Sequence, residues 1–143
     1  MTGSTSTTTY DSDHRPHAVG LLYAADGLDL YLLVGEDSVK VRNVRQNPRV
    51  AVCVPVRKYP FGPPMAVQFQ GTAQLLAPDD PKIRELTAAG RLKRITGLGA
   101  ADRPGTCFLR ITPHRRISSY GLGISLRRLM RDVAQGHRSV AVP

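Results

Sequence analysis

The chain has 143 residues, of which 41% are hydrophobic and 22% charged, a composition typical of one soluble globular domain covering residues 1–143. Its formal charge of +9 predicts an acidic partner, such as a phosphorylated cofactor, a nucleic acid or an anionic surface. No apolar run approaches membrane-spanning length, and the first ten residues lack the apolar core of a signal peptide. We therefore expect a cytoplasmic protein with no membrane partner.

The first part of the chain predicts strands joined by tight turns. We expect residues 1–9 to be disordered, although the threonine-rich stretch Thr5–Asp11 also has a weak strand pattern. After a turn at Ser12–Pro16, the stretch His17–Ala25 predicts a strand. The Asp26-Gly27 pair is a hairpin signal, and Leu28–Gly35 predicts the returning strand.

The stretch Ser38–Arg49 is the most informative part of the sequence. It lies between two short apolar runs that predict strands, and its own pattern predicts a short helix that begins after Ser38 and ends at Asn47-Pro48. The N-terminus of such a helix carries free N–H groups and a partial positive charge, and Lys40 lies in its first turn. The segment therefore predicts a phosphate site, although the same cations would also suit a solvated helix face.

The middle of the chain predicts two further strands. Val50–Val56 is apolar on both faces, which is typical of a covered central strand. A proline-rich loop at 57–64 follows. The stretch Met65–Leu76 alternates between apolar and polar residues, and Gly71 indicates a bulge or a sharp bend in this strand.

The last part predicts helices and strands in turn. Asp80 and Pro81 begin a helix whose apolar face is Ile83, Leu86, Leu92 and Ile95, and Gly97–Gly105 is expected to be a loop. Thr106–Thr112 predicts a strand that Pro113 and His114 interrupt, and Arg115–Tyr120 predicts the last strand. A C-terminal helix is expected from Ser125 to Gly136, so the element pattern predicts a mainly β, closed or nearly closed antiparallel barrel with short peripheral helices.

The sequence contains no motif for protein-based catalysis. It lacks a nucleophile motif, its four histidines make no metal-binding pair, and its glycines form neither a dinucleotide-binding nor a phosphate-binding loop. Cys53 and Cys107 lie in apolar runs and are expected to be buried thiols. We assign no catalytic residue and no metal, and the pattern suits a protein that holds a cofactor with its own chemistry.

Several segments, in this order, resemble one known family. They are Arg15-Pro16-His17, the run ending at Val34, the Ser38-x-Lys40 segment with Asn47-Pro48, the Gly71-Thr-Ala73 segment, Leu109–Pro113 and Ile117-x-x-Tyr120. Together, over about residues 10 to 121, they resemble the pyridoxamine 5′-phosphate oxidase-like, FMN-binding split β-barrel family of flavin and deazaflavin oxidoreductases. The resemblance implies a six- to seven-stranded Greek-key split barrel that forms a homodimer, with FMN or the 5-deazaflavin coenzyme bound between the subunits.

The resemblance also implies cofactor-binding residues. Ser38, Val39 and Lys40 would hold the phosphate. Because Ser38-Val-Lys40 lacks a cation that many members have in this segment, Arg42, Arg45 or an arginine of the partner subunit would replace it. The flavin ring would be lined by Ala18, Val19, Gly20, Leu33, Val34 and Ala66.

Three functions are open at this point. The first is a flavin- or deazaflavin-dependent oxidoreductase that transfers a hydride to or from a small organic substrate. Vitamin B6 oxidases end in Arg-Leu-x-Pro, and this sequence ends in Arg138-Ser-Val-Ala-Val-Pro143, so we expect a different substrate. The second is a flavin-binding carrier without turnover. The third is a small barrel that binds nucleic acid; the low aromatic content of 6% argues against it.

Overall fold

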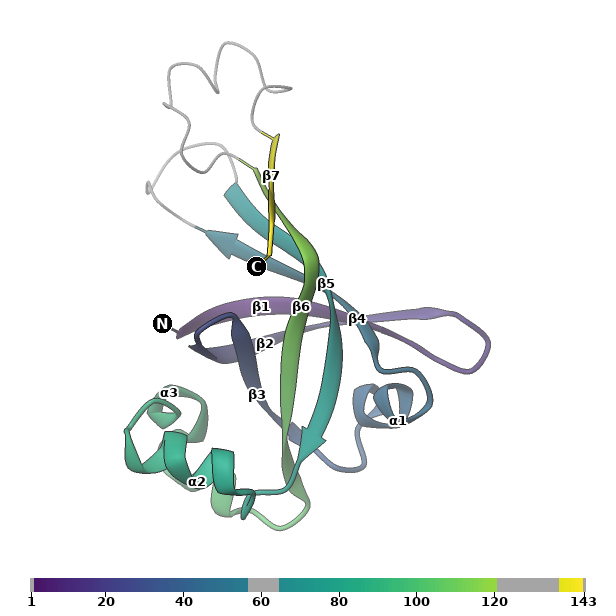
Figure 1. Cartoon of the computed structure of the whole chain (residues 1–143). Coiled ribbons are helices and arrows are strands. Elements are labelled where there is room, and N and C mark those ends of the chain that lie inside the picture. Colours follow the sequence, from purple (N-terminus) through teal and green to yellow (C-terminus); the bar gives the residue numbers. More distant parts are fainter. Residues whose placement is uncertain (1, 57–64, 121–136, 143) are drawn as a thin grey trace.

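The computed structural model describes residues 2–56, 65–120 and 137–142, and its centre is an antiparallel β-barrel (Figure 1). The strands are β1 (Thr2–Tyr10), β2 (Pro16–Asp26), β3 (Asp29–Gly35), β4 (Arg49–Val56), β5 (Met65–Leu76), β6 (Thr106–Tyr120) and β7 (His137–Ala141). They pair in the order β3-β2-β1-β4-β5-β6-β7, and β3 also pairs with β6, which closes the first six into a barrel. The predicted mainly β, Greek-key barrel is confirmed, because β3 and β4 are successive in the chain but not neighbours in the sheet.

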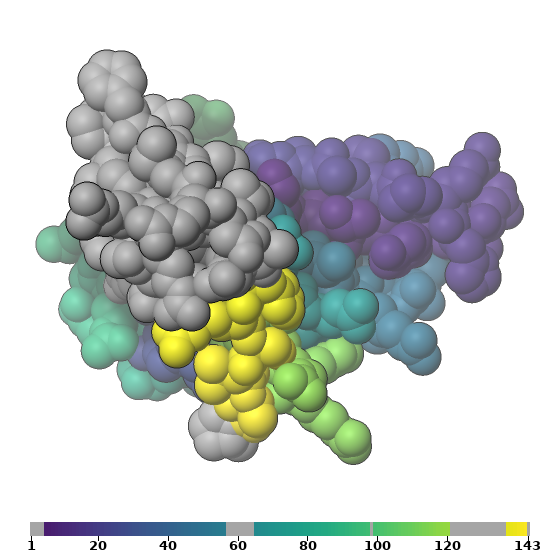
Figure 2. Space-filling model, turned by 90° about the horizontal axis from the view of Figure 1, so that it is seen from above, coloured from purple at the N-terminus to yellow at the C-terminus, as the bar shows by residue number. Residues whose placement is uncertain are grey.

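Strand β7 lies outside the closed barrel and pairs only with the far end of β6, from Arg116 to Tyr120. Figure 2 shows this strand, in yellow, on the surface beside the bright green part of the chain. The sequence did not predict β7. Two other predictions, the loop at 57–64 and the helix from Ser125 to Gly136, lie outside the described residues.

Short helices cover two parts of the barrel, α1 (Val39–Gln46) at one end and the pair α2 (Pro81–Ala88) and α3 (Lys93–Thr96) on one side (Figure 1). The predicted start of α2 is confirmed, since the Asp80 side chain accepts a hydrogen bond from the Lys82 N–H at 2.9 Å. The expected loop after residue 97 is instead a 3₁₀ helix over Gly97–Asp102, followed by a turn. No helix among the described residues is long and apolar enough to cross a membrane.

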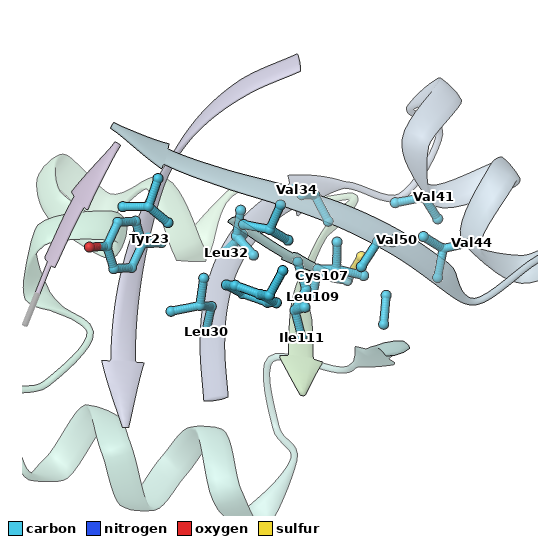
Figure 3. Packing of buried hydrophobic residues seen from close by; sticks show 14 residues of the cluster. Tyr23, Leu30, Leu32, Val34, Val41, Val44, Val50, Cys107, Leu109 and Ile111 are labelled. Carbon is cyan, nitrogen blue, oxygen red and sulfur yellow. The ribbon is translucent and has the colours of Figure 1, made fainter. Parts of the chain in front are cut away.

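The hydrophobic side chains form two cores. The inner core fills the barrel, and Figure 3 shows Val41 and Val44 projecting into it from α1. The outer core packs α2 and α3 on the outside of β3 and β6, where Tyr31 and Phe108 are almost completely buried. The members that the helical segment contributes to this outer core are the predicted apolar positions Ile83, Leu86, Leu92 and Ile95. The inner core fixes the direction of α1 and therefore the position of the N-terminus of α1.

Strand β1 differs from the expectation for the N-terminal residues. It begins at Thr2, whereas disorder was expected for residues 1–9. Thr5, Thr7 and Thr9 are buried and point into the barrel, and Thr5 Oγ1 donates to the Cys53 carbonyl at 3.0 Å. The inward positions are therefore occupied by β-branched polar residues, so the strand lacks the apolar alternation that hydrophobicity patterns detect.

The prediction that Pro113 and His114 interrupt a strand is wrong, because β6 is continuous from Thr106 to Tyr120. Pro113 pairs with Gly71 and Ile117 pairs with Phe69, so three β6 residues lie opposite Gln70 alone. A bulge of this kind removes ladder hydrogen bonds locally, which is where a proline without an N–H is tolerated. The bulge that Gly71 predicted is confirmed at the same place.

Candidate functional site

The N-terminus of α1 is held firmly by the structure around it. Ser38 N–H donates to the Gly35 carbonyl at 3.1 Å, and Glu36 N–H donates to the Gly105 carbonyl at 2.8 Å. Asn43, buried on the same helix, donates to Thr9 Oγ1 at 3.0 Å. These hydrogen bonds attach the start of α1 to β3 and to the turn before β6, and they attach its buried face to β1. The orientation of the first N–H groups is therefore set by the barrel.

Ser38 occupies the position that caps α1, yet its side chain does not cap the helix. Its backbone is extended, and its Oγ is buried without a hydrogen-bond partner. The first helical hydrogen bonds start from Val41 and Arg42, both to the Ser38 carbonyl, so the N–H groups of Val39 and Lys40 precede the ladder. A buried hydroxyl without a partner is costly, and an anion at this point would accept hydrogen bonds from it and from the N–H groups.

The anion site formed by Ser38, Val39 and Lys40, here called the seat, is surrounded by charges of both signs. Lys40 is half-buried in the first turn, while Arg42 and Arg45 are exposed on the following turn. Glu36 and Asp37 precede Ser38 and are exposed, and neither forms an ion pair with a cation in the described parts of the chain. The seat therefore attracts an anion through Lys40 and the helix N–H groups, with two carboxylates nearby.

Strands β2 and β3 separate next to this seat. They pair only from Ala24 to Asp26 on β2 with Tyr31 to Asp29 on β3, so the ladder stops before Leu32. Beyond this point β2 pairs with β1, and β3 pairs with β6. The backbone edge of β3 at Leu33 and Val34 therefore has no ladder partner on its β2 side among the described strands, and it leads directly to Ser38.

The residues predicted to line the ring lie in three places. Ala18 and Gly20 are exposed on β2, opposite Thr8 and Ser6 of β1, while Val19 is half-buried between them. Val34 faces the inner core and Leu33 the outer core, so only their backbone edge is available. Ala66 pairs with Pro55 of β4. Pro55 is six residues after Arg49, so Ala66 lies about 20 Å along the strands from the end of β4 that joins α1. One chain brings Ser38, Val39, Lys40, Leu33 and Val34 together but not Ala66.

The structure also shows a pocket of about 900 Å³ on the outer face of the sheet, which the sequence did not predict. Its cationic lining residues are His114, Arg115, Arg116 and His137. The signal for this site is the His-Arg-Arg run directly after Pro113, since a bulge there places consecutive side chains outside the ladder.

The two cysteines differ in exposure. Cys107 is buried, and burial raises the pKa of its thiol, with Glu36 adding to the effect and Arg45 opposing it. Cys53 is only half-buried and lines the outer pocket, so the expectation of burial holds for Cys107 alone. No cluster of three metal-binding side chains occurs within the described ranges.

A family model described as pyridoxamine 5′-phosphate oxidase matches residues 4–119. The chain belongs to the pyridoxamine 5′-phosphate oxidase family. The match includes all six barrel strands except the first two residues of β1 and the last residue of β6, and it includes α1 and the separation of β2 from β3. The search of curated proteins found no match to the chain.

Solved structures of similar fold bind different ligands. A heme-binding protein from Mycobacterium smegmatis has a TM-score of 0.73 at 17% identity; the match covers 96% of this chain and 52% of that one, so this chain spans about half its length. A candidate pyridoxamine 5′-phosphate oxidase from Listeria innocua has a TM-score of 0.60 at 27% identity, with 80% and 85% covered. A pyridoxamine 5′-phosphate oxidase-related, FMN-binding protein from Nostoc punctiforme has a TM-score of 0.61 at 17% identity, with 98% and 86% covered.

Proposed function

We propose that the protein is an FMN-dependent oxidoreductase whose cofactor phosphate binds at the N-terminus of α1. The observation that carries this proposal is the buried Ser38 Oγ without a partner, beside Lys40 and the N–H groups that precede the helical ladder. Ser38, Val39 and Lys40 suit a phosphate because they combine a hydroxyl, backbone donors and a cation. Membership of the family and the FMN-binding relative of the same fold support the choice of FMN, and the 5-deazaflavin coenzyme is an outcome that the test distinguishes.

The ring of the flavin would lie along the separation of β2 from β3. The unpaired backbone edge at Leu33 and Val34 can donate and accept hydrogen bonds, and the exposed Ala18 and Gly20 leave room for a flat ring. A bound flavin supplies hydride transfer by itself. The protein residues then have the tasks of binding the phosphate, orienting the ring and excluding water, which is consistent with the absence of a protein nucleophile motif.

We also propose that two chains form the complete site. Ala66 lies about 20 Å along the strands from the end of β4 that joins α1. Within one chain it therefore has no access to a ring held at Ser38. A second chain would bring its own Ala66 to the ring, in keeping with the dimer and the cofactor site between subunits that the family resemblance implies.

The identity of the cofactor can be tested directly on the purified protein. We expect a flavin absorption spectrum, with FMN released on denaturation and identified by mass spectrometry. Release of a deazaflavin would keep the site and change the cofactor, and release of heme would contradict the flavin proposal. Turnover with a panel of reductants and acceptors then separates an enzyme from a flavin carrier, because family membership alone does not establish activity.

Replacement of Lys40 tests the phosphate seat. Lys40→Ala removes a charge-assisted contact worth roughly 1.5–3 kcal/mol, so FMN affinity should fall about ten- to a hundredfold. Quenching of FMN fluorescence during titration of the apoprotein measures this affinity. The exposed Arg84 on α2 gives a matched control, and Arg84→Ala should leave the affinity unchanged. Equal affinities for both variants would place the phosphate elsewhere.

A further inference from the structure

One of the buried threonines of β1 is bonded to the helix that carries the seat. Thr5, Thr7 and Thr9 all point into the barrel, but their hydroxyls differ in their partners. Thr5 Oγ1 donates to a carbonyl of β4, and Thr7 Oγ1 has no hydrogen-bond partner among the described residues. Thr9 Oγ1 accepts a hydrogen bond of 3.0 Å from the side-chain amide of Asn43. This bond therefore joins β1 to α1.

The bond between Asn43 and Thr9 is almost completely buried. Asn43 is 4% exposed and Thr9 is 0% exposed. Asparagine is a poor helix former, and a buried amide is costly unless it is hydrogen-bonded. Val41 and Val44 already pack α1 on the inner core, but apolar contacts have no preferred direction. A hydrogen bond has a preferred distance and angle, so Asn43 adds a definite orientation to the helix.

Asn43 lies close to the seat along the helix. It follows Val39 by four residues and Lys40 by three, which places it one turn away on the same side of α1. The Ser38 side chain makes no capping bond. Within the described parts of the chain, the bond of Asn43 is thus the only side-chain hydrogen bond of α1. A rotation or tilt of α1 that moved the seat would have to stretch this bond.

Thr9 belongs to a part of the β1–β2 hairpin that has few other attachments. The pairing of β1 with β4 ends at Thr8, and β2 pairs with β3 only from Ala24 onward. Figure 1 shows the purple hairpin extending past the barrel beside α1. This part of β2 includes Ala18 and Gly20, which we propose to lie along the flavin ring. The Asn43–Thr9 bond therefore connects the strand of the ring with the helix of the phosphate.

We propose that Asn43 and Thr9 are positioning residues for the cofactor, because their bond holds the N-terminus of α1 and the ring-lining part of β2 in one relative position. This inference rests on the proposed function. The two side chains are buried and act without touching the cofactor. Without their bond, α1 would spend less time in the orientation that binds the phosphate, and the affinity for FMN would fall by the same fraction.

Two substitutions that keep the size of the side chains test this role. Thr9→Val and Asn43→Leu each remove one polar partner. The apoprotein is titrated with FMN and with riboflavin, which lacks the phosphate, and quenching of the flavin fluorescence gives both dissociation constants. Each variant should bind FMN about three- to tenfold more weakly, the range that one hydrogen bond accounts for, and should bind riboflavin as the wild type does.

The double variant Thr9→Val/Asn43→Leu separates positioning from stability. Thr9→Val alone leaves the buried amide of Asn43 unpaired and should lower the melting temperature. Replacement of both partners by apolar residues removes that cost, so the double variant should recover the melting temperature but keep the weakened FMN binding. Thr7→Val is the matched control, because Thr7 is buried on the same strand and bonds to no described residue. It should bind FMN with wild-type affinity.

The outcomes distinguish this inference from the proposed function. A double variant with wild-type melting temperature and wild-type FMN affinity would overturn the positioning role, and so would an equal loss of riboflavin affinity or an equal effect of Thr7→Val. If Lys40→Ala weakens FMN binding and the double variant does not, the seat remains and only the positioning role fails. If neither variant changes FMN affinity, or the wild type binds no FMN, the proposed function fails and this inference fails with it.

Discussion

At the scale of single residues, Gly71 has a steric role that its sequence context only partly reveals. A Cβ at this position would lie 2.6 Å from the Thr112 carbonyl oxygen and 3.1 Å from Ile111 Cγ2. The contact is with backbone, which cannot move without disturbing the β5–β6 pairing. The absence of a side chain therefore permits the close approach of β6 at the bulge, and the bulge in turn presents Arg115 and Arg116.

We predict that Gly71→Ala destabilises the fold by about 1–3 kcal/mol, the usual cost of forcing an extra group into a packed site. Urea denaturation followed by circular dichroism measures the difference. Gly97→Ala is the control, since a Cβ there meets no atom within 4 Å and should change stability little. Equal stability of the two variants would show that the bulge adjusts without cost.

Residue-level signals explain which parts of the structure could be predicted from the sequence. The helix start at Asp80-Pro81 and the bulge at Gly71 depend on local chemistry, and the alternation in Met65–Leu76 gives that strand within its exact bounds. Strand β1 was largely missed because its inward residues are threonines, and Pro113 was misjudged because its tolerance depends on a partner strand far away in sequence. The outer pocket depends on the assembled β1, β4, β5 and β6 and was therefore not visible in the sequence.

At the scale of elements, ion pairs hold the helical layer to the barrel. Asp26, at the end of β2, pairs with Lys82 of α2 at 3.1 Å and with Arg91 beyond it. The hydrogen bond from Lys82 is the main cause that lowers the pKa of Asp26, and the same bond raises the pKa of Lys82. A second group, Asp29 with Arg110 and Thr112, links β3 to β6 at the closure of the barrel.

The ion pairs of Asp26 predict that the stability of the fold depends on pH. The pKa of Asp26 is lower in the folded state than in the unfolded state, where it is about 4. The Asp26 carboxylate therefore contributes fully to the free energy of unfolding above the unfolded-state pKa, and this contribution is lost as the pH falls through the folded-state pKa. Asp26→Asn should therefore lower the melting temperature near neutral pH. The melting temperature of this variant should also fall less than that of the wild type between about pH 6 and about pH 3.

Thermal melts across this pH range measure the effect. Asp102→Asn is the control, because the exposed Asp102 forms no ion pair with a described cation, and its acid dependence should match that of the wild type. An Asp26→Asn variant with unchanged acid dependence would mean that the ion pairs contribute nothing to the folded state in solution.

At the scale of the whole molecule, the charge of +9 is unevenly distributed. The carboxylates of Asp11, Asp26 and Asp29 neutralise cations on the β1–β2 turn, on the helical layer and at the barrel closure. The cations of α1 and of the β6 bulge have no ion-pair partner among the described residues; they are Lys40, Arg42, Arg45, Arg115 and Arg116. Other described cations without an ion pair, such as Arg84 and Arg103, lie elsewhere on the surface, so the cations of α1 are only one part of the excess. That part is available to an anionic cofactor.

The separation of Ala66 from the end of β4 that joins α1 gives the last prediction, which concerns assembly. If the flavin contacts α1 of one chain and Ala66 of another, then FMN binds the dimer more tightly than the monomer. By linkage, each FMN bound must strengthen the dimer by the same factor. Sedimentation equilibrium should show a mass of twice 15.6 kDa, with a dimer dissociation constant that falls when FMN is added. Lys40→Ala should weaken the response to FMN but not the dimer of the apoprotein, because the seat itself is formed within one chain. A monomer that binds one FMN with full affinity would show that β2, β3 and α1 of a single chain are sufficient for the site.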